Sequence, residues 1–335
     1  MRPSRTAALA AIVATIAMAL ALGACGEKSE DVTGAAPTPF TLTLDFYPNP
    51  DHAGIYMAEK LGYFADAGLD VSIQTPSDPA APTKLVAAGQ SDLAISYEPE
   101  VLLAHEKGLD VIAIGALVDR PLTSMIWLAK SGVKGIADLR GRTIATAGIP
   151  YQDAYLQTIL ARANLSPADV KTVNVGFGLL PAILGGQADA MLGGFSNVEG
   201  VDLRLRGKAP VVTPVDQLGV PTYDELVLVA NRTRLEEDPE PYRLFLAALA
   251  RGTAAAVKSP AATVDALLEA NRDLDPQLTR SEVDATLPVL SADGRMVAPE
   301  WAGFIAWMRQ NELIASEPEP SQVLSNSYLP GSVPE

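Results

Sequence analysis

The residues best suited to chemistry lie close together in residues 44–64, which read LDFYPNPDHAGIYMAEKLGYF. Within eight positions this stretch places a carboxylate, two aromatic rings, an amide and an imidazole: Asp45, Phe46, Tyr47, Asn49 and His52. Such groups can stack on a flat ligand or exchange hydrogen bonds with it. They surround a turn between a predicted strand and a predicted helix, where polar groups can face a ligand instead of a core.

Two of these residues also have a purely structural interpretation. Asp45 could satisfy backbone groups at the turn, and His52 could bond a backbone group at the helix N-terminus. The choice depends on whether the rest of the chain supplies the second half of a site.

Motifs of the common enzyme classes are missing from the sequence. His52 and His105 have no cysteine partner and no H-E-x-x-H spacing, so no zinc site is predicted. There is no G-x-S-x-G elbow and no Walker A sequence, and residues 176–178 (Gly-Phe-Gly) do not complete a dinucleotide-binding fingerprint. We therefore expect no catalytic residue, no metal and no cofactor.

The N-terminal residues predict export. A basic start, an apolar run over residues 6–22 and the sequence Leu-Gly-Ala-Cys indicate a secretory signal over residues 1–24, whose end resembles a bacterial lipobox. Cys25 is the only cysteine in the chain. We expect it to be lipidated and to anchor the protein on the extracytoplasmic face of a bacterial cell membrane, with residues 25–39 as a flexible tether. The alternative is an ordinary signal peptide with an incidental cysteine.

The charge of the chain limits its partners. Its 25 Lys and Arg against 40 Asp and Glu give a net charge of −15. An acidic protein is repelled by nucleic acid and by anionic lipid surfaces, so we expect no nucleic-acid partner. A small ligand of either sign remains compatible, because the local site decides its binding.

A repeated pattern predicts the organisation of the body. Residues 85–96 read LVAAGQSDLAIS and residues 183–194 read ILGGQADAMLGG. Each copy has an apolar helix end, a glycine, Gln, one small residue, Asp and an apolar strand, and each follows a longer helix and another strand. The repeat favours an α/β protein with two similar lobes. The alternative is that both copies are generic strand–helix–strand units.

Other segments connect and complete these lobes. Residues 122–128 and 222–230 read as strands and are natural crossing points between the lobes. After residue 239 the pattern predicts helices over residues 242–257, 261–270, 280–286 and 300–310. Trp301 and Trp307 are expected to pack within the last of these, and residues 316–335 are expected to be irregular.

The opening motif, AGLDV, LVAAGQSDLAISYE and Asn197-Val198-Glu199-Gly200 together resemble periplasmic solute-binding proteins of the thiamine-pyrimidine-precursor class. That class is grouped with the nitrate-, sulfonate- and taurine-binding proteins of ABC importers. The resemblance implies a two-lobed periplasmic-binding-protein fold of type II, in which each lobe is a mixed sheet flanked by helices and the ligand cleft lies between them. Lobe one would comprise residues 40–123 and 225–335, and lobe two residues 124–224.

The remaining candidate site residues follow from position in that fold. Ligands of open α/β sheets bind beyond the carboxyl ends of the strands, where the following residues are predicted to form the cleft walls: Ser96, Tyr97, Glu98, Tyr151, Phe195, Asn197, Glu199 and, near the hinge, Tyr223. An aminopyrimidine needs an aromatic face, offered by Phe46, Tyr47, Tyr97 or Tyr151. It also needs an acceptor–donor pair, offered by Glu199 or Glu98 with Asn197. The resemblance also implies that relatives hold sulfonate-type anions at the start of the helix that follows residue 148. Pro150 lacks a backbone N–H there, which argues against a sulfonate or nitrate ligand.

The resemblance implies a lipid-anchored, monomeric binding protein that delivers a pyrimidine-type thiamine precursor to the permease and ATPase subunits of an ABC importer. A riboflavin-like heterocycle or a sulfonate, nitrate or taurine ligand is the alternative within the same class. The same superfamily includes the fungal enzyme that makes the thiamine pyrimidine. That enzyme uses a cysteine-rich iron-binding motif, which a chain with only Cys25 cannot provide. A sensor lobe is a third hypothesis, for which no attached signalling domain is visible.

Overall fold

The computed structural model describes residues 36–332, of which residues 37–332 belong to one compact unit. The predicted signal segment, Cys25 and the tether up to residue 35 lie outside the described residues. Among residues 36–332, no helix is both long enough and apolar enough to cross a membrane.

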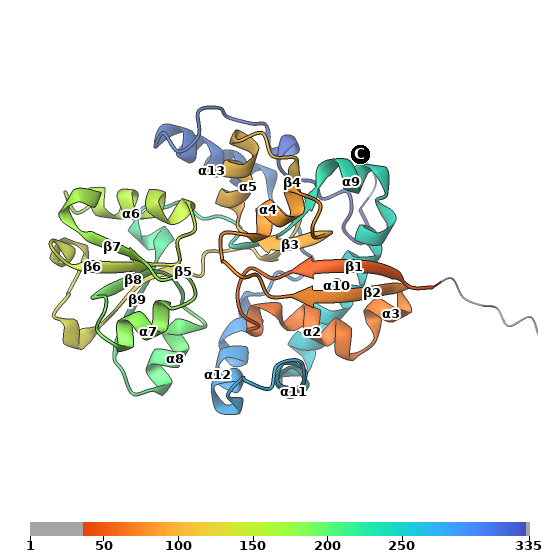
Figure 1. Ribbon diagram of the computed structural model, residues 1–335, viewed down its shortest axis with the longest axis horizontal. Coiled ribbons are helices and arrows are strands. Elements are labelled where there is room, and N and C mark those ends of the chain that lie inside the picture. Colours follow the sequence, from red (N-terminus) through yellow and green to blue (C-terminus); the bar gives the residue numbers. More distant parts are fainter. Residues whose placement is uncertain (1–35, 333–335) are drawn as a thin grey trace, which may run out of the picture. The chain divides into compact units, whose positions relative to one another are not determined.

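The described strands form two five-stranded sheets, each of which is the base of one lobe (Figure 1). Sheet one, in lobe one, has the order β2-β1-β3-β10-β4, with β1 (Thr38–Thr43), β2 (Leu69–Gln74), β3 (Leu93–Ser96), β4 (Val111–Val118) and β10 (Leu226–Asn231). Sheet two, in lobe two, has the order β7-β6-β8-β5-β9, with β5 (Thr123–Leu128), β6 (Thr143–Thr146), β7 (Lys171–Asn174), β8 (Ala190–Phe195) and β9 (Pro210–Pro214).

The two sheets repeat one arrangement, which confirms the two-lobed α/β prediction. In sheet one β1 pairs in parallel with β2 and β3, while β10 runs antiparallel to β3 and β4. In sheet two β6 pairs in parallel with β7 and β8, while β5 runs antiparallel to β8 and β9. The antiparallel strand, β10 in sheet one and β5 in sheet two, therefore occupies the same place in each sheet.

Helices flank both sheets (Figure 1). Those that precede β9 are α2 (Ala53–Lys60), α3 (Tyr63–Asp66), α4 (Pro82–Ala87), α5 (Glu98–Glu106), α6 (Tyr151–Ala161), α7 (Leu179–Leu184) and α8 (Glu199–Leu205). The C-terminal part adds α9 (Arg232–Glu237), α10 (Glu240–Lys258), α11 (Pro260–Ala270), α12 (Pro276–Thr286) and α13 (Ala298–Gln310). The helical C-terminal region is therefore as predicted, except that α12 begins four residues earlier.

Helix α10 is held against lobe one by stacked aromatic rings and by a close helix crossing. The ring of Phe245 stacks on Phe40 of β1 and on Phe64 of α3, at centroid distances of 5.2 and 5.0 Å. A Cβ on Gly252 would lie 2.1 Å from the carbonyl oxygen of Gly54 on α2, so only glycine permits this approach.

Two sequence predictions need correction at their ends. The strand expected over residues 222–230 begins at Leu226, because the preceding residues turn polar groups inward at the crossing between the lobes. The C-terminal segment is not wholly irregular. Ala113 N donates to Val323 O at 2.9 Å and Ser325 N to Ala113 O at 2.9 Å, which covers the open edge of β4.

Candidate functional site

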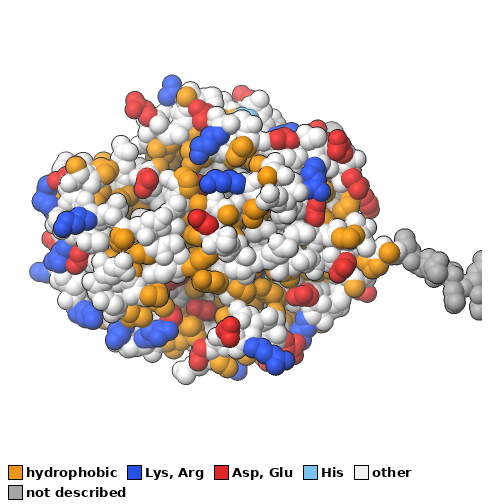
Figure 2. Space-filling model, viewed as in Figure 1, with side chains coloured by type: hydrophobic (Ala, Val, Ile, Leu, Met, Phe, Trp, Pro, Cys, Tyr) orange, Lys and Arg blue, Asp and Glu red, His pale blue; other side chains and the backbone are white. Residues whose placement is uncertain are grey.

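A pocket of about 370 Å³ lies between the carboxyl ends of the strands of both sheets. It is lined by Asp45, Phe46, Asn49 and Tyr97 from lobe one and by Ala147, Ile149, Tyr151, Gly193, Phe195, Val198 and Glu199 from lobe two. Its place beyond the strand ends of two α/β sheets is typical of a small-molecule site. Figure 2 shows hydrophobic side chains exposed through the middle of one face, with charged side chains of both signs both there and toward the outline.

A second hollow, of about 470 Å³, lies within lobe one between α10 and β4. Small and aliphatic residues make up most of its lining. The first pocket is the stronger candidate, because aromatic rings and carboxyl groups from both lobes converge there.

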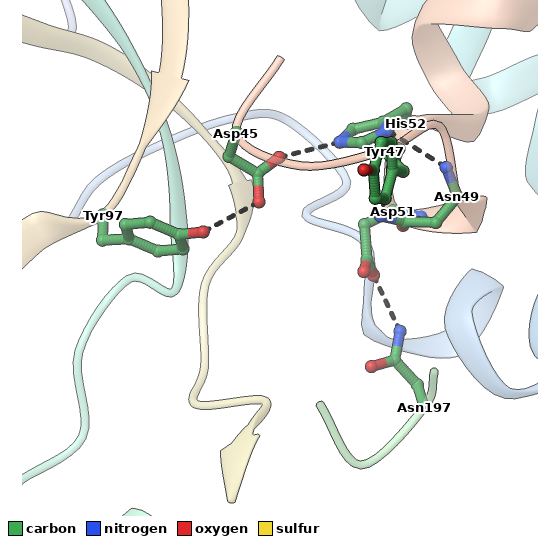
Figure 3. A network of polar contacts seen from close by, with 7 residues as sticks. All are labelled: Asp45, Tyr47, Asn49, Asp51, His52, Tyr97 and Asn197. Carbon is green, nitrogen blue, oxygen red and sulfur yellow. Dashed lines mark hydrogen bonds and ion pairs between the residues drawn. The ribbon is translucent and has the colours of Figure 1, made fainter. Parts of the chain in front are cut away.

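The wall of the pocket in lobe one is built around Asp45, which follows β1 (Figure 3). His52 Nε2 lies 2.8 Å from Asp45 Oδ1, and the hydroxyl of Tyr97 donates to Asp45 Oδ2 at 3.0 Å. The backbone N–H of Asn49 donates to His52 Nδ1 at 3.3 Å, so we assign the imidazole proton to Nε2, which donates to Asp45. His52 is fully buried. His52 therefore orients the Asp45 carboxylate from within the protein, without lining the pocket itself.

The opposite wall comes from the end of β8 and the start of α8. Glu199 Oε2 accepts a hydrogen bond from the backbone N–H of Phe195 at 2.7 Å. Burial raises the pKa of Glu199 to about 7, although the Phe195 N–H opposes this shift. Near neutral pH the carboxyl is therefore partly protonated and can both accept and donate a hydrogen bond.

Tyrosines from the two lobes meet at the inner end of the pocket. The rings of Tyr97 and Tyr151 have centroids 5.2 Å apart, and Tyr151 contacts Tyr155 at 4.9 Å. Burial raises the pKa of all three hydroxyls well above the ordinary value, so they stay neutral. Tyr97 and Tyr151, which line the pocket, therefore offer it aromatic surface and uncharged hydroxyl groups.

Six of the predicted site residues do not line the pocket. They are His52, exposed Tyr47, Ser96, Glu98, Asn197 and Tyr223. Ser96 Oγ lies 2.7 Å from Thr83 Oγ1, and Glu98 Oε2 accepts from Asp224 N at 2.7 Å. The structure thus gives these two buried side chains partners within the protein.

Asn197 links the two lobes. Its Nδ2 donates to Asp51 Oδ1 at 2.7 Å (Figure 3). It also donates to Thr286 Oγ1 at 2.7 Å, so a residue of lobe two is bonded to two elements of lobe one. The sequence suggested Asn197 as a ligand donor, and in the structure its Nδ2 donates to these two protein partners instead.

Sequence reasoning missed two kinds of residue. Ala147, Ile149, Gly193 and Val198 line the pocket with little functional signal of their own, although the Gly-Gly pair at the end of β8 was visible. Gly193 has φ +105, and a Cβ there would lie 2.2 Å from Gln152 Nε2. Glu225, at the crossing between the lobes, was also missed. It is fully buried and bonds residues on both crossing segments.

Buried carboxyls near the cleft predict a pH-dependent stability. Burial raises their pKa values to about 6 for Asp224, about 7 for Glu100, Glu199 and Glu225, and about 9 for Glu282. The folded protein then binds more protons than the unfolded chain, and this contribution to stability is lost as pH rises through the folded pKa values. We expect the free energy of unfolding to fall by a few kcal/mol from about pH 5 to about pH 8. Urea unfolding at constant ionic strength measures this free energy at each pH. A free energy of unfolding that rises with pH over this range would contradict the expectation.

Comparison with known proteins agrees with this geometry. The family model described as NMT1/THI5 like matches residues 49–263. The chain is 36% identical over 281 residues to a protein of Haemophilus influenzae named for thiamine biosynthesis, covering 83% of this chain and 89% of the relative. It is 34% identical over 306 residues to the formylaminopyrimidine-binding protein of Halalkalibacterium halodurans, covering 89% and 92%. Relatives of lower identity include proteins named 4-amino-5-hydroxymethyl-2-methylpyrimidine phosphate synthase.

A solved structure supports the fold. The alkanesulfonate-binding protein SsuA of Xanthomonas axonopodis pv. citri, bound to MOPS, matches with a TM-score of 0.68 at 17% identity, covering 87% of this chain and 99% of that one. The periplasmic-binding-protein fold is thereby confirmed. The resemblance inferred from the motifs is confirmed as well: the chain belongs to the NMT1/THI5-like family.

Proposed function

We propose that this protein is an extracytoplasmic binding protein whose ligand is an aminopyrimidine of the thiamine-precursor type. The observation that carries the proposal is the composition of the pocket. Two carboxyl groups, Asp45 and Glu199, face four aromatic rings drawn from both lobes. Among the described residues of its lining, none is Lys, Arg or His.

This lining suits a flat ring with an exocyclic amine. The aromatic residues Phe46, Tyr97, Tyr151 and Phe195 offer surfaces for a ring, and a carboxyl accepts from an amine. A sulfonate or nitrate would meet two carboxyls without a cation, which disfavours an anionic ligand. The names of the thiamine-related relatives support the same ligand class.

The binding role is preferred to a synthase role, although some relatives are named as synthases. The two more similar relatives reported above are not named as synthases, and one is named for binding. The chain also has a single cysteine, at position 25, so it lacks a cysteine-rich iron-binding motif.

Delivery to an ABC permease and its ATPase, by a monomer lipidated at Cys25, completes the proposal. The support is the lipobox-like sequence before Cys25 and the likeness to transporter-type binding proteins. Mass spectrometry of the mature N-terminus would show an acylated cysteine. An unmodified mature N-terminus would remove the anchor from the proposal.

The ligand is identified by calorimetry and thermal shift with hydroxymethyl-, aminomethyl- and formylaminomethyl-aminopyrimidines, riboflavin, taurine and nitrate. A ligand present at 100 times its dissociation constant stabilises the fold by about 2.7 kcal/mol, which raises the melting temperature measurably. We expect stabilisation by at least one aminopyrimidine. Stabilisation by taurine or nitrate alone would refute the ligand assignment.

A further inference from the structure

We propose that Phe177 closes the mouth of the pocket, packing its ring across the cleft on Phe46 and Tyr47 and so slowing escape of the bound ligand. This inference deepens the proposed function, on which it rests only for the choice of ligand. It assigns a role to a residue that does not line the pocket and that belongs to no recognised motif.

Phe177 stands at the tip of a short turn between β7 and α7 of lobe two. The N–H of Gly176 donates to Asn174 Oδ1 at 2.9 Å, and the N–H of Gly178 donates to Val175 O at 2.8 Å. Gly176 has φ +53, a conformation that glycine adopts without strain. The turn therefore has its own internal hydrogen bonds, while the Phe177 ring is free to contact another part of the protein.

The ring contacts aromatic residues of lobe one. Its centroid lies 4.7 Å from that of Phe46 and 4.5 Å from that of Tyr47, while Phe46 and Tyr47 are 5.6 Å apart. Phe46 also lines the pocket. The three rings thus form a cluster across the cleft, beside the ligand space.

This cluster is not part of the general packing of the protein. Within the described residues, none of the three rings belongs to the hydrophobic core or packs against it. Tyr47 remains 53% exposed. Large aromatic side chains are usually buried in a core, so their grouping at the junction of two lobes needs another reason.

Closure of the cleft supplies that reason. Separation of the lobes would pull Phe177 away from both rings, so these contacts stabilise the closed form alone. A ligand leaves through the open form. Loss of the Phe177 ring should therefore raise the dissociation rate much more than it changes the association rate.

The test is stopped-flow dissociation of the tightest aminopyrimidine from the full-length protein. Phe177→Ala should raise the dissociation rate roughly tenfold, since two aromatic pairs are lost. Phe177→Leu, which keeps apolar bulk, should give a smaller increase. Val257→Ala, at an exposed apolar side chain on α10, is the matched control and should leave the rate unchanged. The double variant Tyr47→Ala/Phe177→Ala should raise the dissociation rate by less than the product of the two single increases.

A ligand-free measurement keeps this inference separate from the ligand assignment. Single-molecule FRET between dyes on Lys134→Cys and Asp265→Cys, exposed positions carried in a Cys25→Ser background, reports lobe closure. Phe177→Ala should lower the closed fraction without any ligand. If no aminopyrimidine binds the wild type, the proposed function fails while this comparison still decides the role of Phe177. An unchanged closed fraction, or an unchanged dissociation rate, in Phe177→Ala would overturn the proposed role of Phe177.

Discussion

Replacing Glu225 by alanine is expected to lower the free energy of unfolding by about 3–5 kcal/mol, because several buried donors lose their acceptor together. Oε2 of Glu225 accepts from Leu122 N at 2.6 Å, Thr123 N at 2.7 Å and the Tyr223 hydroxyl at 2.9 Å. Oε1 accepts from Thr123 Oγ1 at 2.8 Å. The carboxyl therefore joins both segments that cross between the lobes, and urea unfolding followed by circular dichroism measures the loss.

Two variants separate this role from a general effect of substitution. Glu225→Gln keeps one acceptor oxygen and should cost about 1–2 kcal/mol. It should also weaken the fall in stability with pH, because a group with a pKa of about 7 is removed. Asp119→Ala, whose partner is the neighbouring exposed Arg120, is the matched control near the same crossing and should change stability by less than about 0.5 kcal/mol. A comparable loss in Asp119→Ala and Glu225→Ala would contradict the assignment.

The repeat made the two lobes predictable from sequence. Residues 85–96 and 183–194 became the equivalent units α4–β3 and α7–β8, at matching places in the two sheets. Strand β4 was not predicted. All eight of its residues are buried, so no alternation of polar and apolar residues marked the strand. A strand that is covered on both faces carries a weak periodic signal.

The position of the pocket could be predicted from the ends of the strands, whereas the hydrogen-bond partners of the buried polar residues could not. Asp45 and Glu199 line the pocket because each follows a strand of its own sheet. Asn197 bonds to Asp51, 146 residues away. Glu225 bonds to Leu122, 103 residues away. Pairings over such separations depend on the packed fold, and neither residue has a local pattern that reveals its partner.

Glu199→Gln is expected to weaken aminopyrimidine binding by roughly ten- to a hundredfold, because a charge-assisted hydrogen bond to the exocyclic amine is lost while side-chain size is kept. An anionic ligand would respond in the opposite direction, since removal of a nearby negative charge favours it. Calorimetry on the wild type and the variant gives both the size and the sign. Glu282→Gln is the matched control. Its pKa of about 9 makes that carboxyl neutral at pH 7, and it does not line the pocket.

The pH dependence of this difference tests the charge itself. The pKa of Glu199 is about 7, so its carboxyl loses its proton as pH rises through neutrality. At about pH 8 the wild type presents a carboxylate, and its advantage over Glu199→Gln should be greatest. At about pH 6 the protonated carboxyl resembles the neutral amide, so the two affinities should converge. A constant ratio across this range would mean that the ionised carboxylate does not hold the amine. Asp45, fixed by His52 and Tyr97 on the opposite wall, would then be the remaining carboxylate in the pocket lining able to do so.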